Sequence, residues 1–282
     1  MKNIKKYGVI AAILALTLAL TACGGGNSGG STSGGGDDAD KTIKVAATPA
    51  PHAEILESVK EALAAEGWTL EIQEFDDYVL PNQAVTDGEV DANYFQHQPY
   101  LDSYNAENGT DIVNAAAIHY EPLGVYKAKK DSFDAIAEGD KIGVPDDPSN
   151  EARALQLLAA NGLIVLKDGV GLEATVNDIT DYPKGKLEII ETEAVSLPKA
   201  LPDLELAVIN GNYAIGAGLT SADAIAFEAS DSEAAQTYAN IIACANGNEN
   251  SEKVQALIAA LKTDAVKKFI EEKYGDSVKV MF

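Results

Sequence analysis

Arginine, cysteine and histidine are all scarce in this chain of 282 residues. The two cysteines, Cys23 and Cys244, exclude a disulfide scaffold and a zinc site built from clustered thiolates. The three histidines, His52, His97 and His119, stand in none of the short spacings by which a motif holds a metal ion. A nucleophile elbow, a phosphate-binding glycine loop and a His-Glu-x-x-His motif are also absent. We therefore expect a protein that is not an enzyme and that uses no cofactor.

Positive charge is scarce as well. The chain has 21 lysines and arginines against 44 aspartates and glutamates, and its formal net charge is −23. Nucleic acid and anionic membrane surfaces repel such a chain, so we expect neither as a charge-driven partner. Hydrophobic residues make up 46 % of the sequence, enough for a large core, which excludes wholesale disorder. The length fits one large domain or two of ordinary size.

The N-terminus has the pattern of a secretory leader. Three lysines precede an apolar run at 8–20, which is shorter than the ~20 residues of a spanning helix but typical of a signal peptide. The run ends in Leu20-Thr21-Ala22-Cys23, which looks like a bacterial lipobox, with cleavage before Cys23 and acylation of that residue. An ordinary signal peptide with a chance cysteine is the alternative. We predict a lipoprotein signal peptide over 1–22.

A Gly/Ser-rich stretch follows this cysteine. Residues 24–36 are almost wholly Gly, Ser, Thr and Asn, a composition typical of a flexible tether. A soluble secreted enzyme has little use for a tether at this place. We therefore predict a tether over 23–40 and a mature protein anchored by lipid outside the cytoplasmic membrane.

From Lys41 onward, strand-like and helix-like patterns alternate, which predicts an α/β protein with open, mostly parallel sheets. Ligands bind such sheets beyond the carboxyl ends of the strands. Length and tether together favour two lobes with a cleft between them. We expect strands at 43–47, 68–75, 91–95, 112–118, 124–127, 141–144, 187–191, 206–209 and 240–243, and helices at 51–67, 79–85, 99–108, 148–161, 196–201 and 253–272.

The single arginine, Arg153, is a candidate ligand-binding residue. It lies in the first turns of the clearest predicted helix, 148–161, which follows a strand and a short loop. A guanidinium can bind a carboxylate through two parallel hydrogen bonds, and a helix N-terminus adds positive potential. A surface arginine paired with Glu151 or another neighbour is the alternative.

Aromatic residues make up only 6 % of the chain, yet four rings fall within Tyr94-Phe95-Gln96-His97-Gln98-Pro99-Tyr100. Tyr78 is not far away in the sequence. Such rings offer a surface for an apolar side chain, a cation or a sulfur atom, although ordinary core packing explains any one of them. A third candidate is the turn Asn210-Gly211-Asn212, where amides follow an apolar strand and can hold small polar groups; a turn that binds no ligand is the alternative.

At these segments the chain resembles the methionine-binding lipoproteins of ABC importers, the NlpA/MetQ family. The matching segments keep their order over nearly the whole mature domain, and together they are specific. The sequence departs from the family at Asp146, where relatives often have Asn, and at Cys244, close behind Asn240. The matching segments are 48–56, 77–82, 91–97, 99–101, 145–155, 207–214 and 238–242.

The resemblance implies a two-lobed, periplasmic-binding-protein-like (type II) fold with a ligand cleft between the lobes. Lobe one would hold residues 41–121 and 220–282, and lobe two would hold 122–219. The chain would cross between them near 120–124 and 216–222. A ligand that touches both lobes would couple binding to closure.

The resemblance also implies roles for individual residues. The arginine matching Arg153 clamps the ligand carboxylate, and asparagines matching Asn210 and Asn240 hold the backbone of the amino acid. Rings matching four residues of this chain line the side-chain pocket. The full set of expected ligand-binding residues is Tyr78, Phe95, His97, Tyr100, Asn150, Arg153, Asn210 and Asn240.

We therefore expect a monomeric binding protein that captures L- or D-methionine, or a close derivative, and delivers it to an ABC permease and its ATPase. It would sit on the extracytoplasmic face of the cell membrane through the lipid on Cys23. Two alternatives stay open: a receptor for another amino acid or for a methionine-containing dipeptide, and a metal-ion receptor in which the histidines converge with a carboxylate.

Overall fold

The computed structural model describes residues 41–228 and 236–282. The chain divides into two units, Met1–Ala39 and Asp40–Phe282, and the architecture below is that of the second. The predicted signal peptide, the tether and Cys23 lie outside the described residues. In the described ranges, no helix combines the length and the apolar character that crossing a bilayer requires.

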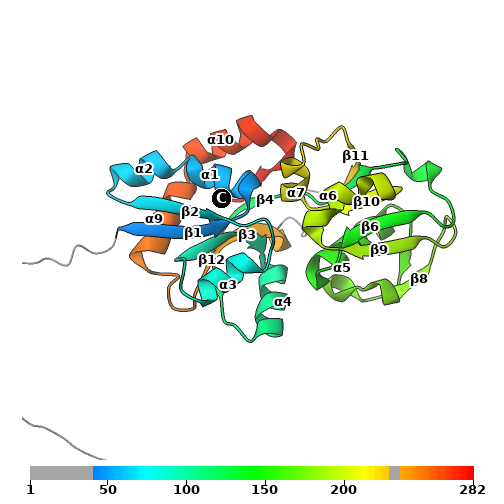
Figure 1. Cartoon of the computed structure of the whole chain (residues 1–282), viewed down its shortest axis with the longest axis horizontal. Helices are drawn as coiled ribbons and strands as arrows, with labels where there is room; N and C mark the ends of the chain where they lie inside the picture. Colours follow the sequence, from blue (N-terminus) through cyan, green and yellow to red (C-terminus); the bar gives the residue numbers. More distant parts are fainter. Residues whose placement is uncertain (1–40, 229–235) are drawn as a thin grey trace, which may run out of the picture. The chain divides into compact units, whose positions relative to one another are not determined.

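Two mixed β-sheets organise Asp40–Phe282 (Figure 1). The first has six strands in the order β13-β4-β12-β3-β1-β2, and the second has five in the order β11-β5-β10-β6-β9. A small third sheet pairs β7 with β8. The strands are β1 (Thr42–Ala47), β2 (Thr69–Glu74), β3 (Ala92–His97), β4 (Val113–Tyr120), β5 (Gly124–Lys127), β6 (Lys141–Pro145), β7 (Val165–Leu166), β8 (Ile179–Asp181), β9 (Glu188–Thr192), β10 (Leu206–Ile209), β11 (Ala224–Phe227), β12 (Ala239–Cys244) and β13 (Lys279–Val280).

The strand directions correct the prediction of mostly parallel sheets. In the first sheet β1 runs parallel to β2 and β3, whereas β12 runs antiparallel to β3 and β4. In the second, β6 is parallel to β9 and β10, and β5 is antiparallel to β10 and β11. Alternating apolar patterns give strand positions but not direction, and the antiparallel strands include those on either side of the passages between the sheets.

Helices cover both faces of each sheet because residues along each strand alternate between the faces. On the six-stranded sheet, α1, α2, α9 and α10 pack on one face and α3 and α4 on the other. On the five-stranded sheet, α5 covers one face, and α6 and α7 cover the other. The helices are α1 (Glu54–Glu57), α2 (Lys60–Ala65), α3 (Leu80–Thr86), α4 (Gln98–Asn108), α5 (Pro148–Ala160), α6 (Leu197–Ala200), α7 (Gly211–Gly216), α9 (Glu252–Leu261) and α10 (Asp264–Tyr274).

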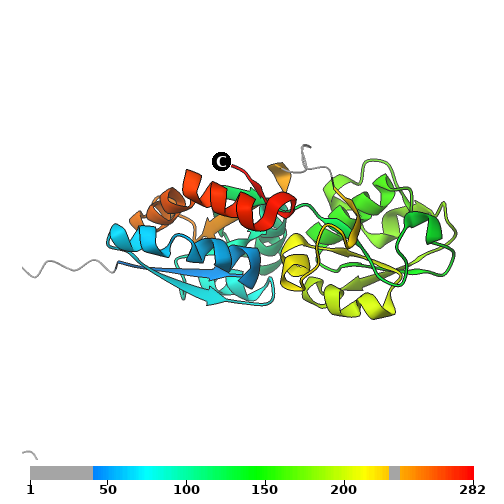
Figure 2. The ribbon, with the colours of Figure 1, turned by 90° about the horizontal axis from the view of Figure 1, so that it is seen from above.

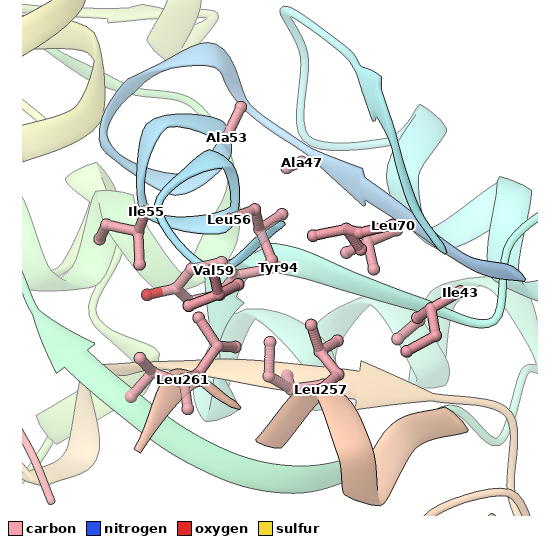
Figure 3. Close-up of a cluster of buried hydrophobic side chains, with 14 of the residues drawn as sticks. Ile43, Ala47, Ala53, Ile55, Leu56, Val59, Leu70, Tyr94, Leu257 and Leu261 are labelled. Carbon is pink, nitrogen blue, oxygen red and sulfur yellow. The ribbon is translucent and has the colours of Figure 1, made fainter. Parts of the chain in front are cut away.

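Each sheet has its own apolar core. In the first, Leu56 and Val59 of the α1 region pack together with Leu257 and Leu261 of α9 and with Tyr94 of β3 (Figure 3). In the second, buried leucines of α5 pack on β6 and β10. Two separate cores make two lobes, as expected for this class of fold.

The chain passes between the lobes twice. The first passage lies between Tyr120, the end of β4, and Gly124, the start of β5. The second was expected at 216–222, but β11 continues the five-stranded sheet to Phe227, and β12 begins only at Ala239. The sequence of a short apolar strand such as β11 does not indicate which sheet it joins. The predicted boundary of lobe two therefore fell before β11, which belongs to the five-stranded sheet.

The helix predicted over 253–272 is in fact two helices. Lys262 leaves helical geometry and Thr263 is extended, with its side chain accepting a hydrogen bond from the N–H of Val266. Thr263 therefore caps α10, which is a common role of threonine. Figure 2 shows α9 and α10 as separate segments along the six-stranded sheet. The break lets both Leu261 and Val266 reach the core.

Candidate ligand-binding site

A polar cavity lies where the two lobes meet. All eight residues expected from the sequence line it, together with Gln96, Glu121 and the two residues that follow Asn210 in the predicted turn. The lining residues are Tyr78, Phe95, Gln96, His97, Tyr100, Glu121, Asn150, Arg153, Asn210, Gly211, Asn212 and Asn240.

Helix α5 presents Asn150 and Arg153 to this cavity. Asp147 is the N-cap residue: its carboxylate accepts hydrogen bonds from the backbone N–H and the side-chain amide of Asn150, each at 3.0 Å. Positions three apart lie on the same face of a helix, so Asn150 and Arg153 both face the cavity. The helix follows β6, which places its N-terminus at the carboxyl end of a strand, where α/β proteins bind ligands.

Arg153 is buried rather than on the surface, with 5 % of its side chain exposed. Its partner is Glu228, not Glu151. The Nε–H donates to both carboxylate oxygens of Glu228 at 2.9 and 3.1 Å, and Nη2 donates to the same carboxylate and to the backbone oxygen of Glu121 at 2.9 Å. The ring of Tyr238 lies 4.2 Å from the guanidinium carbon. One edge of the guanidinium is therefore already in use.

Aromatic rings form one wall of the cavity. The ring centroid of Tyr78 lies 5.7 Å from that of Phe95 and 5.6 Å from that of Tyr100. The hydroxyl of Tyr100 donates to the backbone oxygen of Tyr78 at 3.0 Å. The hydroxyl of Tyr78 donates to Asn212 Oδ1 at 2.6 Å, which connects lobe one to lobe two. The aromatic wall is thus held rigid by its own contacts.

His97 is fixed in one neutral tautomer. Its Nδ1 accepts a hydrogen bond from the backbone N–H of Tyr100 at 3.2 Å, so the proton sits on Nε2, which donates to Asn150 Oδ1 at 3.1 Å. Burial lowers the pKa of His97 to about 3, with the charge of Arg153 as the next cause. His97 therefore enters the site as a neutral donor.

Asn210 leaves one oxygen unused. Its amide nitrogen donates to Asn150 Oδ1 at 2.9 Å, while its own Oδ1 is buried. That oxygen is the one buried side-chain polar atom without a hydrogen-bond partner in residues 41–228 and 236–282. A buried unpaired acceptor costs roughly 1–3 kcal/mol, and this one belongs to a residue that lines the cavity. Asn210 is thus prepared to receive a donor.

Asn240 is oriented from behind by His52. The Nε2–H of His52 donates to Asn240 Oδ1 at 2.9 Å, and its Nδ1 is 2.7 Å from the hydroxyl of Thr48. Burial lowers the pKa of His52 to about 4. The amide nitrogen of Asn240 therefore has a fixed direction.

Glu121 is the functional candidate that the sequence did not reveal. It follows β4, is 5 % exposed, and accepts hydrogen bonds from the backbone N–H of Asn212 and from His119 Nε2, the latter at 2.7 Å. Burial raises the pKa of its carboxyl group, and the smaller electrostatic effects of His52 and then of Arg153 work against this. The position directly after a strand was a signal, but 44 carboxylates concealed it.

His52, His119 and Glu121 together have the atoms to hold a metal ion, since one ligand atom from each lies within 4.8 Å of the others. The same atoms are satisfied without a metal. His119 Nδ1 contacts the hydroxyl of Tyr94, and hydroxyl groups can donate to Nδ1 in both histidines. Both Nε2–H groups then point at oxygen acceptors, a complete hydrogen-bond network.

Two α/β lobes that enclose a polar cleft define a two-lobed substrate-binding protein, a class that closes on its ligand by hinge motion. Residues 43–282 match the family described as NlpA lipoprotein, and the chain belongs to that family. It is thereby related to membrane lipoproteins, as the names of its relatives state.

Three similar proteins show which relatives and structures the chain resembles. The D-methionine-binding lipoprotein MetQ of Escherichia coli is 39 % identical over 93 % of each chain. A putative lipoprotein from Ruminococcus gnavus is 56 % identical, with a TM-score of 0.84 over 86 % of this chain and all of that one. A nutrient-binding protein from Burkholderia cenocepacia, solved with methionine bound, is 43 % identical, with a TM-score of 0.80 over 85 % of this chain and all of that one.

Proposed function

We propose that this protein captures methionine, of either hand, or a close derivative, and delivers it to an ABC permease. The observation that carries the proposal is the unpaired Asn210 Oδ1 in the same cavity as Arg153 and the aromatic wall. An acceptor, a cation and a set of rings correspond to the three parts of methionine. The methionine bound to the Burkholderia relative supports this substrate.

The ligand carboxylate binds Arg153. With Nε and Nη2 engaged by Glu228, the nitrogen left for the ligand is Nη1, which makes no hydrogen bond within the described part of the chain. Hydrogen bonds to a charged partner are worth about 1.5–3 kcal/mol each. The carboxylate is therefore held by charge-assisted bonds from one side of the guanidinium.

The ligand ammonium binds between Asn210 Oδ1 and the carboxylate of Glu121. Both residues line the cavity and both are buried, where an unpaired charge would be costly. A site that offers only neutral acceptors would leave the ammonium uncompensated. Glu121 therefore supplies the opposite charge that the sequence analysis did not anticipate.

The thioether side chain lies against Tyr78, Phe95 and Tyr100. Sulfur–aromatic contacts are worth ~0.3–1.5 kcal/mol each, and a thioether needs no hydrogen-bond partner.

The role in transport rests on the family. We infer that the protein is held on the extracytoplasmic face of the membrane through acylated Cys23, acts as a monomer, and hands its ligand to a permease driven by an ATPase. It performs no catalysis, since its task is capture and release.

A thermal-shift screen tests the substrate. Protein lacking residues 1–23 is unfolded and refolded to remove any ligand, then heated with each amino acid, both methionine enantiomers and Gly-Met. A ligand at 100 times its Kd adds about 2.7 kcal/mol, which raises the midpoint by several degrees. A shift confined to methionine is expected. A larger shift with another amino acid or with Gly-Met would mean that this compound, and not methionine, is the substrate.

A metal receptor is the second candidate, because His52, His119 and Glu121 converge. Zinc or a chelator added to the refolded protein distinguishes it. A thermal unfolding midpoint that responds to zinc but to no amino acid would favour a metal receptor over a methionine receptor.

A further inference from the structure

The guanidinium of Arg153 has two planar edges that can bind a carboxylate. The edge formed by Nε and Nη2 is filled by Glu228, and Nη2 also donates to the backbone of Glu121. This differs from the sequence-based expectation that the ligand itself would take a bidentate edge. The ligand-binding arginine thus carries an internal carboxylate partner from a segment 75 residues away in sequence.

Glu228 is itself firmly held. The hydroxyl of Tyr120 donates to its carboxylate, and the backbone N–H of Leu123 donates to Oε1 at 3.1 Å. The backbone N–H of Glu228 donates to the carbonyl oxygen of Leu123 at 3.0 Å. These partners belong to the first passage between the lobes, whereas Glu228 follows β11. Only 11 % of its side chain is exposed.

We propose that Glu228 is a positioning residue for ligand capture, which holds Arg153 by one edge so that Nη1 faces the cleft. The proposal rests on the proposed binding of an amino acid by Arg153. Glu228 stays on Arg153 when the ligand binds, because Tyr120 and Leu123 fix its carboxylate independently of the arginine. It is neither displaced by the ligand nor a competitor for the guanidinium.

The charges support a permanent pair. A buried guanidinium without a partner is strongly destabilising, and before ligand binds only an internal carboxylate can compensate it. Burial raises the pKa of Glu228, but the charge of Arg153 and the hydrogen bonds outweigh this and keep the pKa below its ordinary value. The pair is therefore ionised in the empty protein as well as in the loaded one.

Nuclear magnetic resonance tests this directly, because Arg153 is the only arginine in the chain and gives the only arginine Nε–H signal. We expect that signal in the wild-type protein to be shifted downfield and slow to exchange with water. It should remain so after L-methionine is added. In Glu228→Gln it should move toward the position of an unpaired arginine. Loss of the downfield signal on adding L-methionine would overturn the proposal, since it would mean that Glu228 is displaced.

Binding measurements give the second readout, with L-methionine and L-methioninamide, which lacks the carboxylate. In Glu228→Gln the affinity for L-methionine should fall by about tenfold or more, which is the contribution of one hydrogen bond to a charged group. The affinity for L-methioninamide should change little. An equal loss for both ligands would mean that Glu228 is only structural. Tighter binding of L-methionine would mean that it competes with the ligand.

Two further variants complete the design. Tyr120→Phe keeps the shape of the ring but removes a donor to Glu228. It should lower the affinity for L-methionine, but not for L-methioninamide, and by less than Glu228→Gln does. If Glu228→Gln does not fold, Tyr120→Phe tests the proposal by the same criteria. Glu205→Gln, which removes an ion-paired carboxylate elsewhere in lobe two, should change the affinity for neither compound. If the wild type binds neither ligand, the proposed function fails, yet the Nε–H signal still reports whether Glu228 holds Arg153.

Discussion

Three charged side chains stand at or beside the cleft, and all are largely removed from water: Arg153, Glu228 and Glu121. Such charges are tolerated only when they are paired and hydrogen-bonded. Arg153 and Glu228 satisfy each other, while Glu121 is satisfied by neutral histidine and backbone donors. In residues 41–228 and 236–282 no lysine or arginine forms an ion pair with Glu121, and the ammonium group of the proposed ligand would take that place.

Replacing the arginine tests the pair. Arg153→Met should abolish methionine binding and lower the free energy of unfolding by about 3–5 kcal/mol, because Glu228 is left as a buried unpaired charge. Urea denaturation measures the stability. The double variant Arg153→Met with Glu228→Gln should recover most of the stability but not the binding. Equal losses of stability in both variants would contradict the pairing.

Gly211 is required by its contact with Glu121. A Cβ at this position would lie 2.7 Å from both Cβ and Oε2 of Glu121. Gly211→Ala should therefore push the carboxylate away, with a stability loss of about 1–3 kcal/mol and weaker methionine binding. Gly216→Ala, in the same helix α7, meets nothing within 4 Å and should be harmless. Calorimetric titration of both variants checks this, and equal binding by the two would contradict the role of Gly211.

At the level of elements, helix α5 contributes two of the cavity-lining side chains, Asn150 and Arg153. Its N-cap residue, Asp147, fixes both the helix and the side chain of Asn150, which in turn contacts His97 and Asn210. One helix start therefore organises donors and acceptors from both lobes.

A pair of cap variants separates stability from function. Asp147→Ala and Thr263→Ala each remove an N-cap, of α5 and α10 respectively, and each should cost about 1 kcal/mol. Only Asp147→Ala should also weaken methionine binding, because only this cap holds Asn150. Thermal unfolding and titration of both proteins make the test. Equal affinity in the two would mean that the cap does not organise the site.

The sequence predicted the positions of strands and helices and the residues of the cleft better than it predicted which residues contact one another. Strong local signals placed β5 and β10 at their observed bounds. Composition singled out Arg153, the single arginine, and the position after an apolar strand singled out Asn210; both line the cavity. Strand direction, the sheet that β11 joins, and the break at Thr263 depend on contacts distant in sequence. Glu228 was missed for the same reason, because its partner Arg153 is distant in sequence. Glu121 was missed because its position directly after a strand was a weak signal among 44 acidic residues.

At the scale of the whole molecule, the cleft residues divide between the lobes. Tyr78, Glu121 and Asn240 belong to the six-stranded side or its exit, and Asn150 and Asn210 to the five-stranded side. A ligand that bridges these groups has higher affinity for the closed arrangement, and this difference couples binding to closure.

Buried neutral histidines make stability depend on pH. The pKa of His52 is lowered to about 4 and those of His97 and His119 to about 3, so all three stay neutral when the unfolded chain takes up protons near pH 6.5. The unfolded state then binds more protons, and stability falls as pH drops from 6.5 toward 4.

Each histidine contributes a slope of up to about 1.4 kcal/mol per pH unit, and protonation of buried Glu121, whose pKa is raised, offsets part of it. Urea denaturation at pH 7.5, 6.5, 5.5 and 4.5 measures this dependence. The free energy of unfolding should change little above pH 6.5 and fall below it. Stability that is constant down to pH 4.5 would contradict the burial of neutral histidines.

The most direct test of the account is a calorimetric titration of the ligand-stripped protein with L-methionine and with 4-(methylthio)butanoic acid, which lacks the ammonium group. The account predicts saturable binding of one L-methionine per chain. It predicts that the acid binds weaker by about a hundredfold, because buried acceptors left unpaired cost roughly 1–3 kcal/mol each. Absence of methionine binding in the folded protein, or equal affinity for the two compounds, would contradict a cleft built around Arg153, Asn210 and Glu121.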